Sequence, residues 1–227
     1  MRRPPSLPEL LTPRLWFPDP RLADGEGLVA IGGDFSVQRL LVAYRSGIFP
    51  WTDAPITWWS PDPRAVIELD GFHVPKSLAK LLRKGAFEIT ADRAFREVMA
   101  GCAKPAPGRG ETWVTPTFIA AYTRLHELGH AHSLECWQGG RLVGGIYGVA
   151  IGGFFAGESM FHRVSNASKV ALASLVGHLR ERGFALFDIQ MLTPVTRQLG
   201  GVEIPRAEYL NRLAEAVALG RTFSNAG

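Results

Sequence analysis

The sequence predicts a mixed α/β (α+β) fold in two parts, a small irregular N-terminal domain over residues 1–63 and a larger C-terminal domain over residues 64–227. Pro, Gly and Trp crowd the first part, which has room for a single helical stretch. In the second part, segments with helical periodicity alternate with strand-like segments. A chain of 227 residues, 46% hydrophobic and 20% charged, can build a sizeable globular core.

The expected helix of the N-terminal domain covers residues 37–46. Its apolar residues Leu40, Leu41 and Tyr44 recur at helical spacing. The segments around it are rich in the turn-forming residues Pro, Gly and Asp, as in Phe17-Pro18-Asp19-Pro20, Gly32-Gly33-Asp34 and Gly47-Ile48-Phe49-Pro50-Trp51. We therefore expect irregular structure on both sides of this helix.

The first half of the C-terminal domain is predicted to consist of helices and short strands. Periodicity predicts helices over residues 75–84, 93–102 and 116–128, with a strand over residues 87–90. A strand over residues 131–138 precedes Gly139-Gly140, a pair that favours a hairpin turn. The glycine-rich segment 142–156 then predicts two further strands.

The second half begins with a helix that Ser165 or Asn166 can cap and that runs to Arg182, before Gly183. Its apolar stripe consists of Val170, Ala173, Val176 and Leu179. Residues 184–189 form a short apolar run that predicts a buried strand. A closing helix over residues 206–219 completes the mixed α/β domain.

Composition excludes several classes of protein. The N-terminal residues lack an apolar stretch of signal-peptide length and the chain shows no membrane span, so we expect a cytoplasmic protein without membrane association. Cys102 and Cys136 lack the paired spacing of a zinc site and are too few for a disulfide framework, so we interpret both as buried thiols. Walker-type and dinucleotide-binding glycine motifs are also missing from the sequence.

The segment His126-Glu127-Leu128-Gly129-His130 fits the H-E-x-x-H pattern of zinc proteases. Zinc binding needs both histidines on one face of a helix. Gly129 is typical of a helix end, which would carry His130 into the next strand. We therefore expect no metal here and interpret His126 as a surface residue in the last helical turn, where a cation suits the helix dipole.

Four cations lie close together in the predicted helix 75–84. Lys76, Lys80 and Arg83 are spaced four and three residues apart, which keeps them near one helix face, and Lys84 follows. The net charge is only +4, but the pI of about 9.3 leaves room for a local basic patch. This stripe suits a phosphate backbone, although a solvated helix face explains the same pattern.

Two further segments carry candidate chemistry. Glu158 stands within the apolar run Gly157-Glu158-Ser159-Met160-Phe161, and a buried carboxylate needs either a function or a structural partner. Asp188 and Gln190 lie two residues apart on a predicted strand, so their side chains project from the same face. A site at a strand end fits this polar pair, and so does a strand that simply reaches solvent.

Taken together, these segments resemble the bacterial leucyl/phenylalanyl-tRNA–protein transferase family over nearly the whole chain. The resemblance is carried by Phe17-Pro18-Asp19-Pro20, Gly27-Leu28-Val29-Ala30-Ile31-Gly32-Gly33-Asp34, Tyr44-Arg45-Ser46-Gly47-Ile48-Phe49-Pro50-Trp51, Trp58-Trp59-Ser60-Pro61, Ala131-His132-Ser133-Leu134-Glu135, Gly157-Glu158-Ser159-Met160-Phe161 and Phe187-Asp188-Ile189-Gln190. It implies a C-terminal domain of the GCN5-related acyltransferase type. The glycine loop with which such domains hold coenzyme A is not present before Asn166, where the sequence is His162-Arg163-Val164-Ser165. The fold therefore need not bring a thioester donor.

The resemblance also implies an activity and its site residues. The family transfers Leu or Phe, and Met less well, from aminoacyl-tRNA to proteins that begin with Arg or Lys, which marks them for degradation, and it needs neither ATP nor metal. The matching donor-pocket positions are Trp51, Trp113, Tyr122, Ile146, Phe155 and Glu158, and the matching tRNA-binding cations are Lys76, Lys80, Arg83 and Lys84. By resemblance, Gln190 accepts a hydrogen bond from the attacking amine, and Asp188 orients Gln190.

An amide is too weak a base to hold the proton outright, so Gln190 is expected to position the amine or relay its proton, with the 3′-terminal ribose hydroxyl as a candidate final acceptor. We expect no cofactor and a monomeric chain. Two alternatives remain open from the sequence, an acetyltransferase that uses coenzyme A and a non-enzymatic RNA-binding module.

Overall fold

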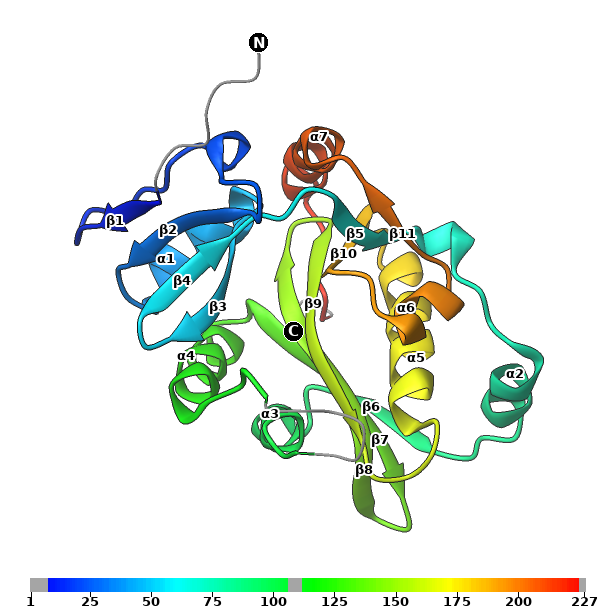
Figure 1. Ribbon diagram of the computed structural model, residues 1–227. Coiled ribbons are helices and arrows are strands. Elements are labelled where there is room, and N and C mark those ends of the chain that lie inside the picture. The colour runs from blue at the N-terminus through cyan, green and yellow to red at the C-terminus, as the bar shows by residue number, and fades with distance from the viewer. Residues whose placement is uncertain (1–7, 106–111, 225–227) are drawn as a thin grey trace.

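The computed structural model describes residues 8–105 and 112–224 and contains two β-sheets (Figure 1). The smaller sheet has the strand order β1-β2-β4-β3, formed by Glu9–Leu11, Leu28–Gly32, Ile56–Trp59 and Phe49–Asp53. Only β1 and β2 run parallel in it. The segment predicted to be irregular therefore holds a regular sheet, beside the predicted helix α1 (Val37–Arg45).

The larger sheet has seven strands in the order β11-β5-β10-β9-β8-β7-β6. Their bounds are Gly201–Ile204, Arg64–Ile67, Leu186–Gln190, Phe154–His162, Arg141–Ile151, Ala131–Gln138 and Glu88–Ala91. All neighbouring strands are antiparallel except β9 and β10. This parallel pair is joined by the crossover helix α5 (Ala167–Glu181). The mixed α/β class predicted from the sequence is confirmed.

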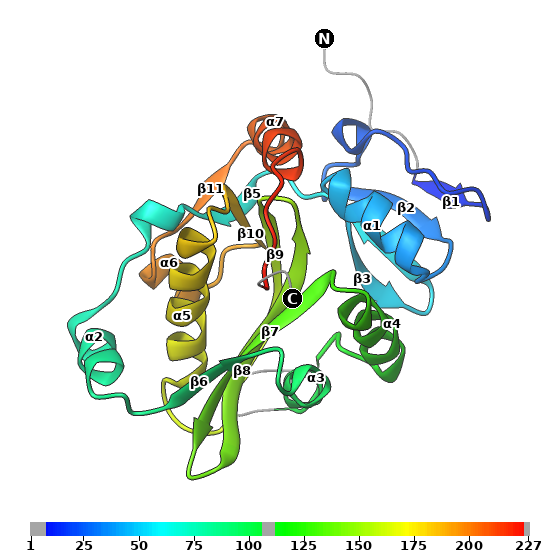
Figure 2. The same cartoon turned by 180° about the vertical axis from the view of Figure 1, so that it is seen from behind.

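Helices cover both faces of the larger sheet (Figures 1 and 2). Helix α5 packs on β7, β8 and β9, and α2 (Lys76–Arg83) packs on the outer side of α5. On the opposite face lie α3 (Phe95–Cys102), α4 (Pro116–Glu127) and α7 (Arg206–Val217). A short helix, α6 (Pro194–Gln198), links β10 to β11. Two 3₁₀ turns, at Pro20–Leu22 and Leu69–Gly71, complete the described elements.

Alternation along the strands divides the buried side chains between two cores. In β9 and β10, Phe154 and Leu186 belong to the core under α3, α4 and α7, and Phe155 and Phe187 belong to the core under α5. A period of two along a strand sends neighbouring side chains to opposite faces. The first core continues without a break into the smaller sheet and α1, where it takes in residues such as Tyr44 and Trp58.

Most predicted elements of the C-terminal part are confirmed within a few residues. The pair of strands predicted over residues 142–156 extends further in the structure, where β9 ends at His162. Short elements were missed, namely β5, α6 and β11. The Gly139-Gly140 turn is confirmed, since both residues have positive φ angles. Asn166 precedes α5 in the left-handed region, but its side chain makes no capping hydrogen bond.

The predicted buried thiols are confirmed, since Cys102 and Cys136 are both buried. Burial raises the pKa of the Cys136 thiol to about 12, which leaves it unreactive at neutral pH. Within residues 8–105 and 112–224, no helix is long and apolar enough to cross a membrane.

Gly47 shows how closely the parts are packed. It follows α1 with a φ of +75°, and a Cβ atom there would lie 2.5 Å from Leu210 Cδ2 and 3.0 Å from Tyr209 Cε1, both in α7. A non-glycine residue would have to adopt the unfavourable left-handed backbone and also displace α7.

We predict that Gly47→Ala lowers the free energy of unfolding by about 2–5 kcal/mol, the sum of backbone strain and overpacking. Gly129→Ala is the matched control, because Gly129 has nearly the same φ of +76° and open space where its Cβ would be. It should lose only about 1–2 kcal/mol. Urea denaturation measures both, and equal losses would contradict the packing argument.

Candidate active site

The polar pair Asp188 and Gln190 lies at the end of the interior strand β10. The register shifts between them, so that Asp188 pairs with Val66 and Gln190 pairs with Ala65. Gln190 has a φ of +60°, a conformation that costs a non-glycine residue about 1–3 kcal/mol and persists only where the surroundings enforce it. The chain turns sharply after it, with the Met191 amide donating to the Ile189 carbonyl over 2.6 Å.

Asp188 is fully buried and its carboxylate accepts four hydrogen bonds. Arg64 donates two of them, from Nε over 2.9 Å and from Nη2 over 2.7 Å. Tyr209 Oη donates over 2.9 Å, and the backbone amide of Gln190 donates over 2.9 Å. The carboxylate is thereby saturated, and the contact between Asp188 and Gln190 runs through the Gln190 backbone rather than its side-chain amide.

Arg64 is equally buried and completes this network. Its Nη1 donates to the Gly47 carbonyl over 3.1 Å, and its guanidinium stacks on the rings of Phe49 and Tyr209. Burial is the largest single effect and lowers the pKa of Arg64, but Asp188, Tyr209 and Glu158 together outweigh it, and the pKa is raised. The guanidinium thus stays charged and fixes the Asp188 carboxylate.

Glu158 on β9 is the second buried carboxylate. It accepts a 2.7 Å hydrogen bond from Gln190 Nε2 and a longer one, 3.5 Å, from Tyr122 Oη, which is itself hydrogen-bonded to Tyr44 Oη. Burial raises the pKa of Glu158 to about 8; the Asp188 charge adds to this effect, and hydrogen bonds from Tyr44 and Gln190 oppose it. A carboxyl group with this pKa exchanges its proton near neutral pH.

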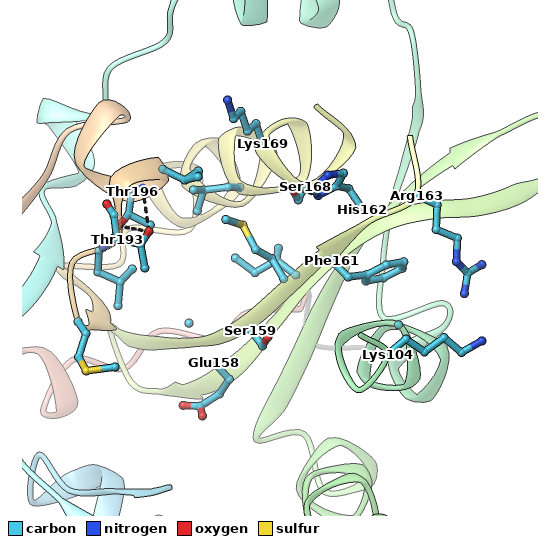
Figure 3. A pocket seen from close by; sticks show the side chains of 18 of the residues that line it. Lys104, Glu158, Ser159, Phe161, His162, Arg163, Ser168, Lys169, Thr193 and Thr196 are labelled. Carbon is cyan, nitrogen blue, oxygen red and sulfur yellow. Dashed lines mark hydrogen bonds between the residues drawn. The ribbon is translucent and has the colours of Figure 1, made fainter. Parts of the chain in front are cut away.

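A cavity of about 550 Å³ opens next to Glu158, because β9 and β10 pair only as far as Ala156 and Asp188 and then diverge. Apolar side chains line much of it, including those of Ile146, Met160, Leu172 and Ile189. Figure 3 shows Glu158 and Ser159 beside this cavity, with Thr193 and Thr196 on the α6 side.

A second, smaller pocket of about 40 Å³ lies among Phe49, Pro50, Trp51, Trp113, Glu158, Gln190 and Met191. Glu158 and Met191 therefore line both pockets. Glu158 is hydrogen-bonded to Gln190, which lines the smaller pocket. An amide and a carboxylate so placed can bind an amine and accept a proton from it.

The structure brings together most of the donor-pocket positions predicted by resemblance. Trp51, Trp113 and Glu158 line the small pocket, Tyr122 contacts Glu158, and Ile146 lines the large cavity. Phe155 lines neither; it packs on Phe187 and Phe223 in the core under α5, with ring centroids 5.8 and 5.5 Å away.

Sequence reasoning missed Arg64 and Tyr209, which hold Asp188 in place. A signal for Arg64 was available, because it is a lone cation directly before the apolar strand Ala65-Val66-Ile67, and a buried charge needs a partner. The partner, 124 positions away, carries no local signal.

The predicted basic stripe lies on α2, on the outer side of α5 (Figure 1), and no residue of α2 lines either pocket. Lys76, Lys80, Arg83 and the following Lys84 are all at least partly exposed, while Leu78 of the same helix is buried. None of the four cations forms an ion pair with any residue in the described part of the chain. The stripe is therefore available to an anionic partner.

The H-E-x-x-H segment does not form a zinc site. Helix α4 ends at Glu127 and Gly129 has a positive φ, so His126 and His130 do not share a helix face. Across residues 8–105 and 112–224, no three His, Cys, Asp or Glu side chains are grouped to hold a metal ion. The expected surface position of His126 is wrong: its ring is half-buried, stacks on Phe95 at 4.4 Å and bonds the Ala131 carbonyl.

Solved structures similar to this chain include GCN5-related acetyltransferases. One, from Kribbella flavida, is 13% identical, with a TM-score of 0.40, and the match covers 72% of this chain and 59% of that one. A different similar structure, titled L-PGS from Bacillus licheniformis, is 15% identical, with a TM-score of 0.41, and the match covers 74% of this chain and 54% of that one. At these TM-scores we base no argument on either similarity.

Sequence relatives are much closer. A chain named leucyl/phenylalanyl-tRNA--protein transferase from Magnetococcus marinus is 53% identical over 209 residues, which covers 89% of this chain and 88% of the relative. Chains of the same name from Nitratidesulfovibrio vulgaris and Anaeromyxobacter sp. are 53% and 52% identical, covering 88% of this chain and 87% and 88% of theirs.

Two family models match as well. One, described as leucyl/phenylalanyl-tRNA protein transferase, matches residues 66–214, and the other, described as the N-terminal domain of that transferase, matches residues 33–62. The first model alone spans more than half of the chain. This chain therefore belongs to the leucyl/phenylalanyl-tRNA protein transferase family.

Proposed function

We propose that this transferase moves Leu or Phe, and Met less well, from aminoacyl-tRNA to the N-terminal Arg or Lys of acceptor proteins, and so creates an N-terminal degradation signal. Family membership supports aminoacyl transfer from tRNA to proteins. We propose a monomer that works in the cytoplasm without a metal or cofactor. Residues 1–63 and 64–227 would be its two domains, which the two separate family matches support.

The observation that carries this proposal is the hydrogen-bonded pair of Glu158 and Gln190 beside the two pockets. Peptide-bond formation from an aminoacyl ester needs no external energy source, because the ester is already activated. It needs the amine held against the carbonyl carbon and a group that takes up the amine's proton. Gln190 and Glu158 offer these two capacities within 2.7 Å of each other.

The large cavity suits the side chain of the donor amino acid. Its apolar wall of Ile146, Met160, Leu172 and Ile189 matches Leu, Phe and Met, and each methylene of misfit costs about 1–3 kcal/mol. In this arrangement Phe155 does not contact the donor side chain and belongs to the core under α5. Trp51, Trp113 and Tyr122 would shape the smaller space, where aromatic faces can stack on the terminal base.

The side-chain amide of Gln190 is oriented by its hydrogen bond to Glu158. Because Nε2 donates to the Glu158 carboxylate, Oε1 is left to accept a hydrogen bond from the attacking α-amine. Gln190 is thus a positioning group. Asp188 acts one step further back, because its oxygens are occupied by Arg64, Tyr209 and the Gln190 amide. It holds the backbone that carries Gln190.

Glu158 is the acid–base group of this scheme. The amine nitrogen attacks the ester carbonyl, the new C–N bond forms, and a proton from the amine passes to the Glu158 carboxylate. Collapse of the tetrahedral intermediate breaks the bond to the 3′-terminal ribose oxygen, and the protonated Glu158 returns the proton to that oxygen. A pKa of about 8 fits both halves of this exchange.

Gln190→Ala should lower kcat about 100-fold, by analogy with the loss of one preorganised hydrogen bond at a reacting group, while tRNA affinity changes less than a few fold. Radiolabelled Phe-tRNA and a protein beginning with Arg provide the assay, with label followed into base-stable protein. Gln138→Ala, at an exposed glutamine of β7, is the matched control and should remain fully active. Normal turnover in Gln190→Ala, or no transfer by the unaltered protein, would refute the proposal.

The pH dependence of transfer should reveal Glu158. Below pH 8, log(kcat/KM) should rise with a slope near two, because both Glu158 and the acceptor's α-amine, whose pKa is about 8, must lose a proton. Glu158→Gln should be much slower and should rise with a slope near one, and Glu215→Gln, at an exposed carboxylate, should behave like the unaltered protein. A slope of two in Glu158→Gln would exclude this role.

The same pKa shift affects stability. Folding raises the pKa of Glu158 from its ordinary value of 4.5 to about 8, so the folded state binds this proton more tightly than the unfolded state does. The free energy of unfolding should therefore fall as pH rises from 4.5 towards 8. Glu158→Gln should lose this component of the pH dependence, which urea denaturation at a series of pH values measures.

The cations of α2 should serve the tRNA backbone. Lys80→Gln/Arg83→Gln should weaken tRNA binding and reduce the slope of log K against log salt by about 0.9 for each phosphate that the variant no longer neutralises. Arg21→Gln/Arg197→Gln, which removes two exposed cations elsewhere, should leave both unchanged. Filter binding at several salt concentrations tests this. An unchanged slope would contradict tRNA binding by the stripe and would leave a solvated helix face as its explanation.

A further inference from the structure

Met191 is the most exposed methionine in the described part of the chain. The sequence contains four methionines, Met1, Met99, Met160 and Met191, of which Met1 lies outside the described residues. Met99 is fully buried in α3, Met160 is half-buried on β9, and Met191 is 46% exposed. A small reagent in solution therefore reaches Met191 more readily than it reaches Met99 or Met160.

Met191 also belongs to the candidate active site, since it lines both the large cavity and the small pocket. It directly follows Gln190, whose side chain donates to Glu158 over 2.7 Å. The backbone is held here, because the Met191 amide donates to the Ile189 carbonyl over 2.6 Å. The unbranched side chain itself is flexible. A ligand that fills both pockets has to lie against this thioether.

An exposed thioether reacts with hydrogen peroxide without the help of a catalytic group. The sulfur lone pair attacks one peroxide oxygen, an S–O bond forms, and the O–O bond breaks. The hydroxide that leaves takes the proton of the transferred hydroxyl group and becomes water. Sulfur is oxidised and the peroxide is reduced, and the product is methionine sulfoxide, a polar and chiral group that sulfoxide reductases convert back to methionine.

The other sulfur atoms in the described ranges are less accessible to such a reaction. Cys102 and Cys136 are buried, and burial raises the pKa of the Cys136 thiol to about 12, so little of the thiolate that peroxide oxidises is present. Met160 lines the large cavity but not the small pocket. Limited peroxide should therefore modify Met191 first.

We propose that Met191 is an oxidative modification site, at which hydrogen peroxide reversibly lowers transfer activity by forming the sulfoxide. The effect on transfer rests on the proposed function, in which the donor side chain occupies the large cavity and the terminal base occupies the small pocket. The bound donor then covers the Met191 side chain. A sulfinyl oxygen there either loses its hydrogen bonds to water under the donor or holds the donor away from Glu158, and both effects weaken donor binding.

The first experiment treats the unaltered protein with increasing amounts of hydrogen peroxide, locates sulfoxide by peptide mass spectrometry and measures transfer from Phe-tRNA in the same samples. Met191 should be oxidised ahead of Met160 and Met99. The kcat/KM for Phe-tRNA should fall about tenfold, as expected when one polar group is buried without a partner. The fall should follow Met191 sulfoxide and not Met1 sulfoxide, and sulfoxide reductases A and B together should restore the activity.

Two variants separate Met191 from the other methionines, and each is compared with its own untreated activity. Met191→Leu should keep that activity after peroxide treatment, because leucine has no sulfur. Met160→Leu is the matched control, since it removes the other methionine of the large cavity. It should lose activity to the same degree as the unaltered protein.

The donor should also protect this site. A saturating concentration of 3′-deoxy-3′-(phenylalanylamino)adenosine, a stable donor analogue whose binding calorimetry measures, should slow oxidation of Met191 and leave oxidation of added free methionine unchanged.

Three results would overturn the proposal: oxidation of Met160 or Met99 ahead of Met191, an equal loss of activity in Met191→Leu, or an analogue that binds without protecting Met191. Failure of the proposed function is a separate outcome, because the untreated protein would then show no transfer from Phe-tRNA whatever the order of oxidation.

Discussion

The buried ion pair between Arg64 and Asp188 is the interaction on which the rest of the site depends. It joins β5 to β10, and through Gly47 and Tyr209 it extends to the turn after α1 and to α7. Two buried charges regain little net free energy over their desolvation, but removing one partner costs about 3–5 kcal/mol. The pair therefore contributes to the specificity of the fold more than to its stability, because any other arrangement of these four elements would leave a buried charge without a partner.

The divergence of β9 and β10 opens the candidate active site beside this ion pair. Parallel pairing ends at Asp188, and beyond it the two strands are linked through the side chains of Glu158 and Gln190. Aliphatic side chains line much of the large cavity at this gap, and aromatic side chains line much of the small pocket. Glu158 is buried beside this gap, and that burial raises its pKa.

The sequence predicted the long helices and the β7–β8 turn because these rest on local periodicity and on glycine conformation. It missed β1 to β5 and β11, which are strands of three to five residues, one of them containing Pro50, whose stability comes from neighbours far along the chain. Asp188, Gln190 and Glu158 could be singled out as polar residues in apolar surroundings. Arg64 also carries a signal, as a lone cation before an apolar strand. Its pairing with Asp188 and the roles of Tyr209 and Tyr44 could not be predicted, because only tertiary packing brings these residues together.

The core that runs from the smaller sheet into the larger one also limits how this protein can be divided. Tyr44 from α1 closes over Tyr122, and Leu40, Phe49 and Trp58 share one apolar cluster with Phe118 and Leu213. A fragment beginning at Arg64 would expose that cluster to water and leave Arg64 without the Gly47 carbonyl. The N-terminal segment is therefore a wall of the candidate active site, and recombination between relatives would have to exchange it together with α4 and α7.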